Sequence, residues 1–253
     1  MQDVVNAPLR AGGTESPSSR SSNPAKSVQR TLYHFPLDPA SRQVRLALAE
    51  KKLAFTDVVE RYWEGRPDFL ALNPSGLTPV LVEAGDDQPM VICESRAILE
   101  HLEETEPQLA LLSANPRDRA EARRLMQWFD RKFDFEVDAF LVHEKMEKRL
   151  LGLGAPDHDA MRRGRDGLRL HLRYLEKLLE ARDWLAGARL SLADIAAASH
   201  LSVIDYFGDI PWRDYPGVKT WYMKIKSRPS FRPLLADRLP GLTPVAYYAD
   251  IDF

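Results

Sequence analysis

The sequence has little cysteine and little charge excess, and it lacks a long apolar run. Of its 253 residues only Cys93 is a cysteine, which excludes an internal disulfide framework and favours a reducing compartment. No apolar run approaches the roughly 18 residues of a membrane-spanning helix, and the N-terminus lacks the apolar core of a secretory signal. The formal net charge of −2 gives no basic excess for nucleic acid or an anionic membrane. We therefore expect a soluble cytoplasmic protein.

Candidate metal ligands and nucleophiles are equally scarce. The six histidines are widely separated, and no H-x-x-x-H or Cys/His cluster occurs, so we predict no metal site. Cys93 ends the apolar run Val91-Ile92-Cys93, which favours a buried structural thiol over a reactive one.

The first half of the chain predicts an α/β domain. Residues 1–28 are rich in Ser, Gly, Pro, Ala and Asn and predict a disordered extension. From residue 29 to residue 107, strand and helix patterns alternate and then give a hairpin across Gly85-Asp86-Asp87 and a last helix. This order is typical of a thioredoxin-like domain, in which helices pack on a small mixed sheet. The predicted strands are 30–35, 55–61, 79–83 and 90–93, and the predicted helices are 41–51, 67–73 and 95–104.

The second half predicts only helices. Residues 108–240 carry apolar side chains at helical spacing, first over 117–137 with a continuation over 139–150, and then over 157–181. Ser191 and Asp194 form a capping-box pattern at the start of an apolar helix, 192–204. Two shorter helical segments and a tail, 241–253, follow. We predict an all-helical second domain with a C-terminal tail.

Two motifs of the first domain indicate a peptide-binding cleft. In Asn73-Pro74-Ser75-Gly76-Leu77-Thr78-Pro79, Pro79 opens an apolar strand, where a cis Thr78-Pro79 bond would turn the Thr78 backbone toward a ligand. Glu94 and Ser95 stand where a strand ends and a helix begins, a position that favours a carboxylate. A proline turn and a capped helix without a ligand would give the same residues. The pair, in this order, resembles the glutathione-binding half of the glutathione transferase superfamily.

That resemblance implies a hydroxyl or thiol near the end of the first strand, donating a hydrogen bond to the glutathione thiolate. One alignment puts His34 in this slot, and the other puts Asp38, Pro39 and Ala40 there. A carboxylate such as Asp38 repels a developing thiolate. Ser41 is the remaining weak catalytic candidate, although serine is also an ordinary helix-start residue. The part that activates the thiolate is therefore expected to be missing, while the peptide-holding part is present.

Longer stretches carry a narrower resemblance over about residues 29–253. Val59-Glu60-Arg61-Tyr62-Trp63-Glu64, Leu125–Lys132 and the terminal Ala249-Asp250-Ile251-Asp252-Phe253 resemble the glutathione-transferase-like proteins of alphaproteobacteria that bind the division GTPase FtsZ. This resemblance implies a dimeric, non-enzymatic protein at the division site that binds FtsZ filaments and promotes constriction. It also implies a functional C-terminal tail.

Site residues follow from these two resemblances. The expected glutathione site, vestigial or working, is Thr78, Pro79, Glu94 and Ser95. No cofactor is expected, and glutathione stays open as an occupant. Trp63 is a natural interface anchor, and three aromatics in the last seven residues need a surface to cover. Packing of the tail and of Trp63 on their own chain is the alternative. The expected partner-binding residues are Trp63, Tyr248, Asp250, Ile251, Asp252 and Phe253.

The sequence also bears on the oligomeric state and on an alternative function. The run 117–150 has both an apolar face and a dense charged face, so we expect a two-fold homodimer in which it meets the sheet domain of the partner. A working glutathione transferase that conjugates glutathione to electrophilic small molecules is the alternative function, because Thr78, Glu94 and Ser95 are all retained.

Overall fold

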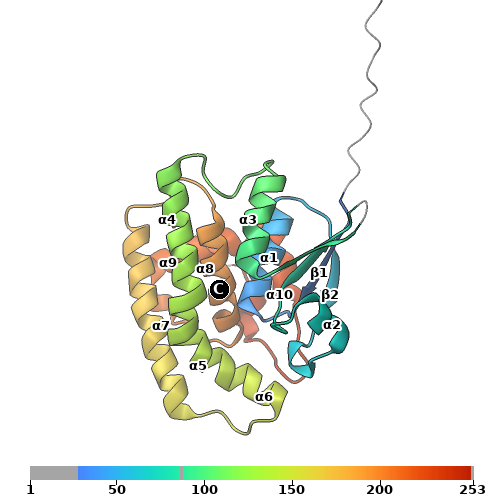
Figure 1. Ribbon diagram of the computed structural model, residues 1–253. Coiled ribbons are helices and arrows are strands. Elements are labelled where there is room, and N and C mark those ends of the chain that lie inside the picture. Colours follow the sequence, from blue (N-terminus) through green and yellow to red (C-terminus); the bar gives the residue numbers. More distant parts are fainter. Residues whose placement is uncertain (1–27, 86–87, 252–253) are drawn as a thin grey trace, which may run out of the picture.

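The computed structural model, which describes residues 28–85 and 88–251, has a small sheet domain beside a larger helical one (Figure 1). The first contains a four-stranded mixed sheet and the second is helical. This confirms the predicted fold class. The predicted extension, apart from Val28, lies outside the described residues, as do Asp86 and Asp87 of the predicted turn.

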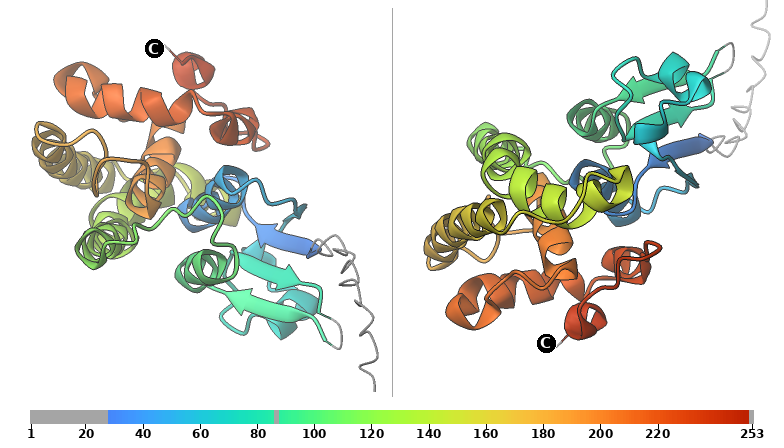
Figure 2. Two further views of the ribbon diagram at one scale, coloured as in Figure 1. Left: turned by 90° about the horizontal axis from the view of Figure 1, so that it is seen from above. Right: turned by 90° about the horizontal axis from the view of Figure 1, so that it is seen from below.

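The sheet has the strand order β2-β1-β3-β4, with β1 parallel to β2 and antiparallel to β3. Helices α1 and α3 lie on the face that looks toward the helical domain, and α2 lies on the other side (Figures 1 and 2). The strands are β1 (Arg30–His34), β2 (Thr56–Val59), β3 (Val80–Glu83) and β4 (Met90–Cys93), and the helices are α1 (Pro39–Glu50), α2 (Pro67–Leu72) and α3 (Ser95–Thr105). Between the sheet and α1 and α3 lies an apolar core of Leu32, Val44, Leu48, Leu81, Ile92, Ile98 and Leu102.

The second strand is shorter than the sequence predicts. The predicted strand ran over 55–61, whereas β2 ends at Val59 and a 3₁₀ turn, η1 (Tyr62–Glu64), follows. Glu60 explains the early end, because its side chain is buried and forms an ion pair with Arg66 over 2.6 Å. A buried acid of this kind needs a cation beside it, and Arg66, the residue before α2, supplies one.

One long, bent helical run forms the edge of the second domain facing the sheet domain (Figure 1). The two helices predicted at 117–137 and 139–150 are continuous, as the sequence suggested, but the run changes between α-helical and π-helical turns. Its segments are α4 (Pro116–Gln127), η2 (Trp128–Asp138), α5 (Ala139–Val142), η3 (His143–Glu147) and α6 (Lys148–Leu151), with π-helical hydrogen bonding in η2 and η3.

The remaining helices surround α8, whose residues are all buried. The predicted capping box is confirmed, because Ser191 accepts a backbone hydrogen bond from the first turn while Asp194 accepts one from the Ser191 N–H over 2.9 Å. Helix α1 packs on α8 and so joins the two domains. These helices are α7 (His158–Leu179), α8 (Leu192–Tyr206), α9 (Pro216–Lys226) and α10 (Arg232–Ala236), joined by the short turns η4 (Trp212–Asp214) and η5 (Pro229–Phe231) and followed by η6 (Ala246–Ala249).

None of the helices within residues 28–85 and 88–251 is both long and apolar enough to cross a membrane.

Candidate functional site

The loop before β3 and the start of α3 lie side by side. The Thr78-Pro79 bond is cis, as the motif predicts. In the antiparallel register of β3 and β4, Val80 is opposite Cys93. The residues just before β3 and just after β4 therefore meet at one end of the sheet. The fold thus brings together Thr78, Pro79, Glu94 and Ser95.

Side-chain hydrogen bonds hold the loop before β3. The Asn73 amide nitrogen donates to the Leu77 carbonyl over 2.8 Å, while its oxygen accepts from the Ser75 N–H over 3.2 Å. Asn73 is buried, whereas Leu77 is half exposed at 51%. The loop is therefore fixed from inside, and its outer face is open to a partner or ligand.

On the other side, Glu94 has a left-handed backbone with φ 72° and an exposed side chain. This conformation is uncommon for a residue with a Cβ. It leads the chain from β4 into α3, where the half-buried Ser95 is the first residue. The Glu94 side chain makes no capping bond to the helix.

Asp38 occupies the slot in which a thiolate donor is expected. It is the N-cap of α1 and accepts hydrogen bonds from the Ala40 N–H and the Ser41 N–H, each over 3.1 Å. The Thr78 hydroxyl donates to the same carboxylate over 2.9 Å. Burial raises the pKa of Asp38, although these bonds act in the opposite direction.

The Ser41 hydroxyl already donates its hydrogen to another side chain. Its side chain is fully buried, its hydroxyl donates to Asp38 over 2.6 Å, and its oxygen accepts from the Phe35 N–H over 3.2 Å. A hydroxyl that has given its one hydrogen to Asp38 has none left for a thiolate. The geometry therefore favours the helix-start role of Ser41 over the weak catalytic candidacy.

The alternative slot residue, His34, points into the sheet domain. Its side chain is 1% exposed, and its Nε2 lies 2.5 Å from an Asp57 carboxylate oxygen. Tyr33, on the opposite strand face, packs its ring against Phe69 with 6.0 Å between ring centroids.

Carboxylates dominate the electrostatics near Asp38. Burial raises the pKa of Asp134, and burial raises that of Asp138 to about 6 despite the opposing charge of His200. The negative charge of Asp38 also raises the pKa of Asp138. Burial also raises the pKa of Tyr62, with further contributions from Glu147 and Asp38. A thiolate brought here would meet negative charge, which raises rather than lowers the pKa of a thiol.

His200 is the cation beneath these acids. Its Nδ1 lies 2.5 Å from Asp138, and its Nε2 lies 3.6 Å from Asp130, which is a charge contact rather than a hydrogen bond. Burial alone would lower the pKa of His200, but the charges of Asp138 and Asp130 outweigh it and raise the pKa to about 10. This cluster was not predicted from the sequence. The spacing of Asp130, Asp134 and Asp138, four residues apart, was its only signal.

Asp130 also links the domains. It accepts a hydrogen bond from Gln43 of α1 over 2.8 Å and forms an ion pair with Arg96 of α3, also over 2.8 Å. The helical run is therefore tied to both helices of the sheet domain that face it.

Cys93 differs from expectation. Its side chain is partly exposed rather than buried, and its thiol contacts the Leu72 carbonyl at 3.5 Å. It ends an edge strand, so no further strand covers it. Burial and then the Glu94 charge raise the pKa of the thiol, which opposes a reactive thiolate.

Trp63 is half-buried. Its ring packs edge-on against Phe35 and Tyr62, at centroid distances of 5.0 and 5.1 Å. Trp63 therefore covers apolar side chains of its own chain and keeps part of its surface open.

Tyr248 corrects a prediction. We expected it at a partner surface, but its side chain is 0% exposed, because it packs edge-on against Tyr206 and hydrogen-bonds with the guanidinium of Arg42. The next residues are outside, with Asp250 exposed and Ile251 42% exposed. Asp252 and Phe253 lie outside the described residues.

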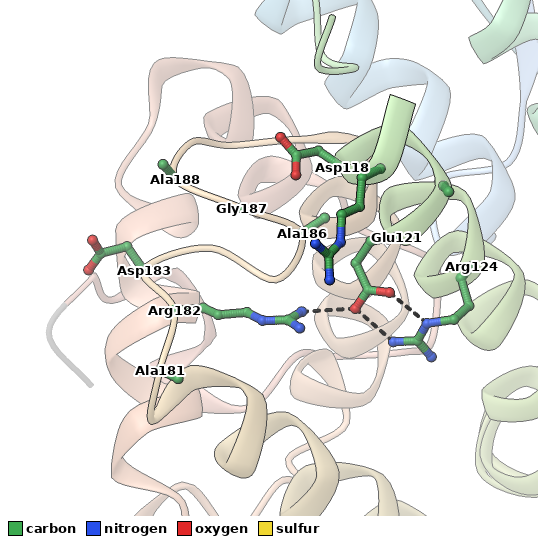
Figure 3. A pocket seen from close by; sticks show the side chains of 11 residues that line it. Asp118, Glu121, Arg124, Ala181, Arg182, Asp183, Ala186, Gly187 and Ala188 are labelled. Carbon is green, nitrogen blue, oxygen red and sulfur yellow. Dashed lines mark hydrogen bonds and ion pairs between the residues drawn. The ribbon is translucent and has the colours of Figure 1, made fainter. Parts of the chain in front are cut away.

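The hollow in Figure 3, of about 660 Å³, is a separate feature whose lining residues all belong to the helical domain. Glu121 lies between Arg124 and Arg182 and accepts hydrogen bonds from both, at 2.8 to 2.9 Å. These bonds lower the pKa of Glu121 to about 2. Arg117, Asp118 and Asp183 also line the hollow, so both signs of charge are present and nothing here selects an anion or a cation.

Within the described part of the chain no group of three or more His, Cys, Asp or Glu side chains is placed to hold a metal ion.

Comparisons with known proteins agree with the fold. The family model for the glutathione S-transferase N-terminal domain matches residues 39–105, and that for the C-terminal domain matches residues 137–229. The chain is 68% identical to FtsZ-localized protein A of Caulobacter vibrioides over 90% of this chain and 100% of the relative. It is 34% identical to glutathione S-transferase 3 of Zea mays over 81% of this chain and 92% of that protein.

Solved structures are similar as well. FzlA from C. crescentus superimposes with a TM-score of 0.88 at 68% identity, covering 89% of this chain and 100% of that one. A glutathione S-transferase from Rhodospirillum rubrum F11 gives a TM-score of 0.84 at 50% identity, covering 88% of this chain and 100% of that one.

Proposed function

The chain belongs to the glutathione S-transferase family, and from this premise we propose that it is a non-enzymatic regulator of cell division that binds FtsZ filaments and promotes constriction. The observation that carries the proposal is the likeness to FtsZ-localized protein A over the full length of that relative. Its place of action would be the cytoplasm at the division site.

The thiol slot supports a role without catalysis. Asp38 stands where a donor would be needed, and the Ser41 hydroxyl already donates to it. A transferase accelerates conjugation by stabilising the thiolate. The carboxylate of Asp38, which stands in the slot and raises the pKa of Asp138 and of Tyr62, acts against that form.

The runner-up is a glutathione transferase. One observation favours it: Thr78, Glu94 and Ser95 lie at one end of the sheet, as a peptide-holding site requires. Under the leading proposal these residues are a vestigial or still occupied glutathione site without turnover.

Partner contact is assigned to the tail beyond Tyr248 and to the open part of Trp63. Asp250 and Ile251 are exposed, and Asp252 and Phe253 follow in the sequence. The two acids, Asp250 and Asp252, suit a basic partner surface, and they make binding sensitive to salt. Ile251 and Phe253 would supply the apolar contact.

The homodimer is part of the same proposal. A groove of about 420 Å³ lies between the bent run and α7, with Trp128, Phe140 and Tyr174 among its lining residues. Phe135 and Leu170, 73% and 57% exposed, stand at its side. Apolar side chains this exposed favour burial against a second protein surface. In the proposed dimer the sheet domain of the second copy meets this run, and that domain carries the exposed apolar side chain of Met90.

Two measurements test the function. Purified protein is sedimented with FtsZ filaments, and it is assayed for conjugation of glutathione to an electrophilic aromatic substrate. We expect co-sedimentation that weakens as salt rises, and no conjugation above the uncatalysed rate.

Absence of co-sedimentation at low salt would contradict the FtsZ proposal. Turnover that is lost in Ser41→Ala but kept in Ser199→Ala, a second buried serine hydroxyl, would establish the transferase instead.

A further inference from the structure

The Arg42 side chain joins segments that are distant in the sequence. It lies on α1, is 0% exposed, and sits where the sheet domain meets the helical domain. A guanidinium has five N–H donors in a rigid plane, so it can hold several segments in one arrangement. Its hydrogen bonds run from Nε to Pro36 O (2.7 Å), from Nη1 to Ser202 Oγ (2.6 Å) and Tyr248 Oη (3.0 Å), and from Nη2 to Asp237 Oδ2 (3.0 Å).

Tyr248 is the counterpart of Arg42 in the C-terminal segment. Of the described residues from 241 to 251 it is the one whose side chain is buried. Its hydroxyl accepts from Arg42 and donates to the Leu234 carbonyl over 3.2 Å, so both its donor and its acceptor are used. The Lys226 ammonium lies 5.7 Å from the centre of its ring.

Backbone bonds do little to place this segment. Val245 N–H donates to the Tyr206 carbonyl over 3.1 Å, but the bonds recorded beyond it, from Tyr248 N–H and Asp250 N–H, reach only three residues back. The last turn, η6, packs against α10, and Figure 2 shows this red end of the chain at the outer side of the helical domain. Val245 and Tyr247 are partly buried against the core, and Tyr248 is the fully buried side chain nearest the last described residues.

We infer that Arg42 is a positioning residue for partner binding, which acts through Tyr248 to fix where the acidic, apolar C-terminus leaves the body of the protein. The inference deepens the proposed function and rests on it, since the partner residues are those beyond Tyr248. Arg42 also forms an ion pair with Asp237, and this pair remains when the tyrosine hydroxyl is removed. Tyr248→Phe is consequently a mild change that leaves the ring packed against Tyr206.

The test follows the segment directly. In a Cys93→Ser background, exposed Ala249 is replaced by cysteine and labelled with a nitroxide. Tyr248→Phe is expected to increase the mobility of the label and to weaken co-sedimentation with FtsZ by about tenfold. The matched control is Ser202→Ala, which removes another bond of the same Arg42 nitrogen and leaves the tail anchored.

Ser202→Ala should lower the melting temperature without mobilising the label. Equal label mobility in wild type and Tyr248→Phe would overturn the inference, and so would equal mobilisation by both variants, which would show a general loss of structure. If wild-type protein does not bind FtsZ, the partner-binding role of Arg42 falls with the proposed function. The label still reports in that case whether the Tyr248 hydroxyl, which Arg42 and the Leu234 carbonyl both contact, holds the segment.

Discussion

Thr78 donates its hydroxyl hydrogen to Asp38 Oδ2 over 2.9 Å, which ties the loop before β3 to the first turn of α1. The same carboxylate caps α1 and accepts the Ser41 hydroxyl. An acid that is awkward for thiolate chemistry is therefore useful for the structure, because it satisfies donors at the end of a helix where backbone N–H groups have no partner.

Asp38→Ala should destabilise the protein by about 2–3 kcal/mol, because the cap is lost and the hydroxyls of buried Ser41 and half-buried Thr78 lose their acceptor. Asp38→Asn keeps one acceptor oxygen and should cost less. Urea denaturation of both variants measures the difference. Equal stability of wild type and Asp38→Ala would show that these bonds contribute nothing net.

His200 should make stability fall as pH rises above neutral. Its pKa is raised to about 10 in the folded protein, so its contribution is complete below pH 6.5 and is lost as the pH approaches 10. One proton contributes a slope of up to about 1.4 kcal/mol per pH unit. Melting temperatures of wild type and His200→Gln between pH 7 and pH 9.5 test this.

The wild-type slope should flatten in His200→Gln. The control is His171→Gln, because burial lowers the pKa of His171 and leaves that imidazole neutral over the whole range. A slope unchanged in His200→Gln would mean that other groups carry the pH dependence.

Asp194→Ala should destabilise by about 3–5 kcal/mol, more than a helix cap alone provides. The capping box accounts for the bonds from Ser191, but Asp194 Oδ1 also accepts from the Leu185 N–H over 2.8 Å and from the Trp221 indole N–H over 2.9 Å. Removing the carboxylate leaves these buried donors unpaired. Ser191→Ala, which removes only the cap, should cost about 1–2 kcal/mol by guanidinium denaturation. Similar losses of stability in Asp194→Ala and Ser191→Ala would show that the bonds to Leu185 and Trp221 contribute little beyond the cap.

Two C-terminal truncations, one that keeps Tyr248 and one that removes it, should distinguish residues needed for binding from residues needed for stability. Removing residues 250–253 should leave the melting temperature nearly unchanged and abolish most FtsZ co-sedimentation, since they follow Tyr248, the last buried side chain of the described residues. Removing residues 248–253 should additionally destabilise the protein by about 3–5 kcal/mol, because a buried aromatic is lost. Full binding by the shorter truncation would remove the tail from the proposed interface.

Phe135→Asp should convert the proposed dimer into a monomer without lowering the melting temperature, because its side chain is 73% exposed and stands beside the apolar groove. Leu153→Asp, at 57% exposure in the connection between α6 and α7, is the matched control and should stay dimeric. Analytical ultracentrifugation at micromolar concentration distinguishes the two states. A monomeric wild-type protein would refute the dimer.

The sequence by itself determined the fold class, the order of elements, the cis proline and the capping box. Each of these is written in local patterns: the spacing of apolar residues, Pro79 at the start of a strand, and Ser191 followed three residues later by Asp194. Such patterns act through neighbouring residues along the chain, so they can be seen before the chain is folded.

Only the tertiary structure decided which side chains from distant segments meet. Tyr248 looked like a surface aromatic until Arg42, 206 residues away, was placed against it. Ser41 looked available until its hydroxyl was bonded to Asp38. The acid cluster around His200 likewise arises because η2 packs on α8. Whether a side chain is buried, and which partner it bonds to, depends on how all the elements of the core pack together. A local sequence pattern does not contain that information.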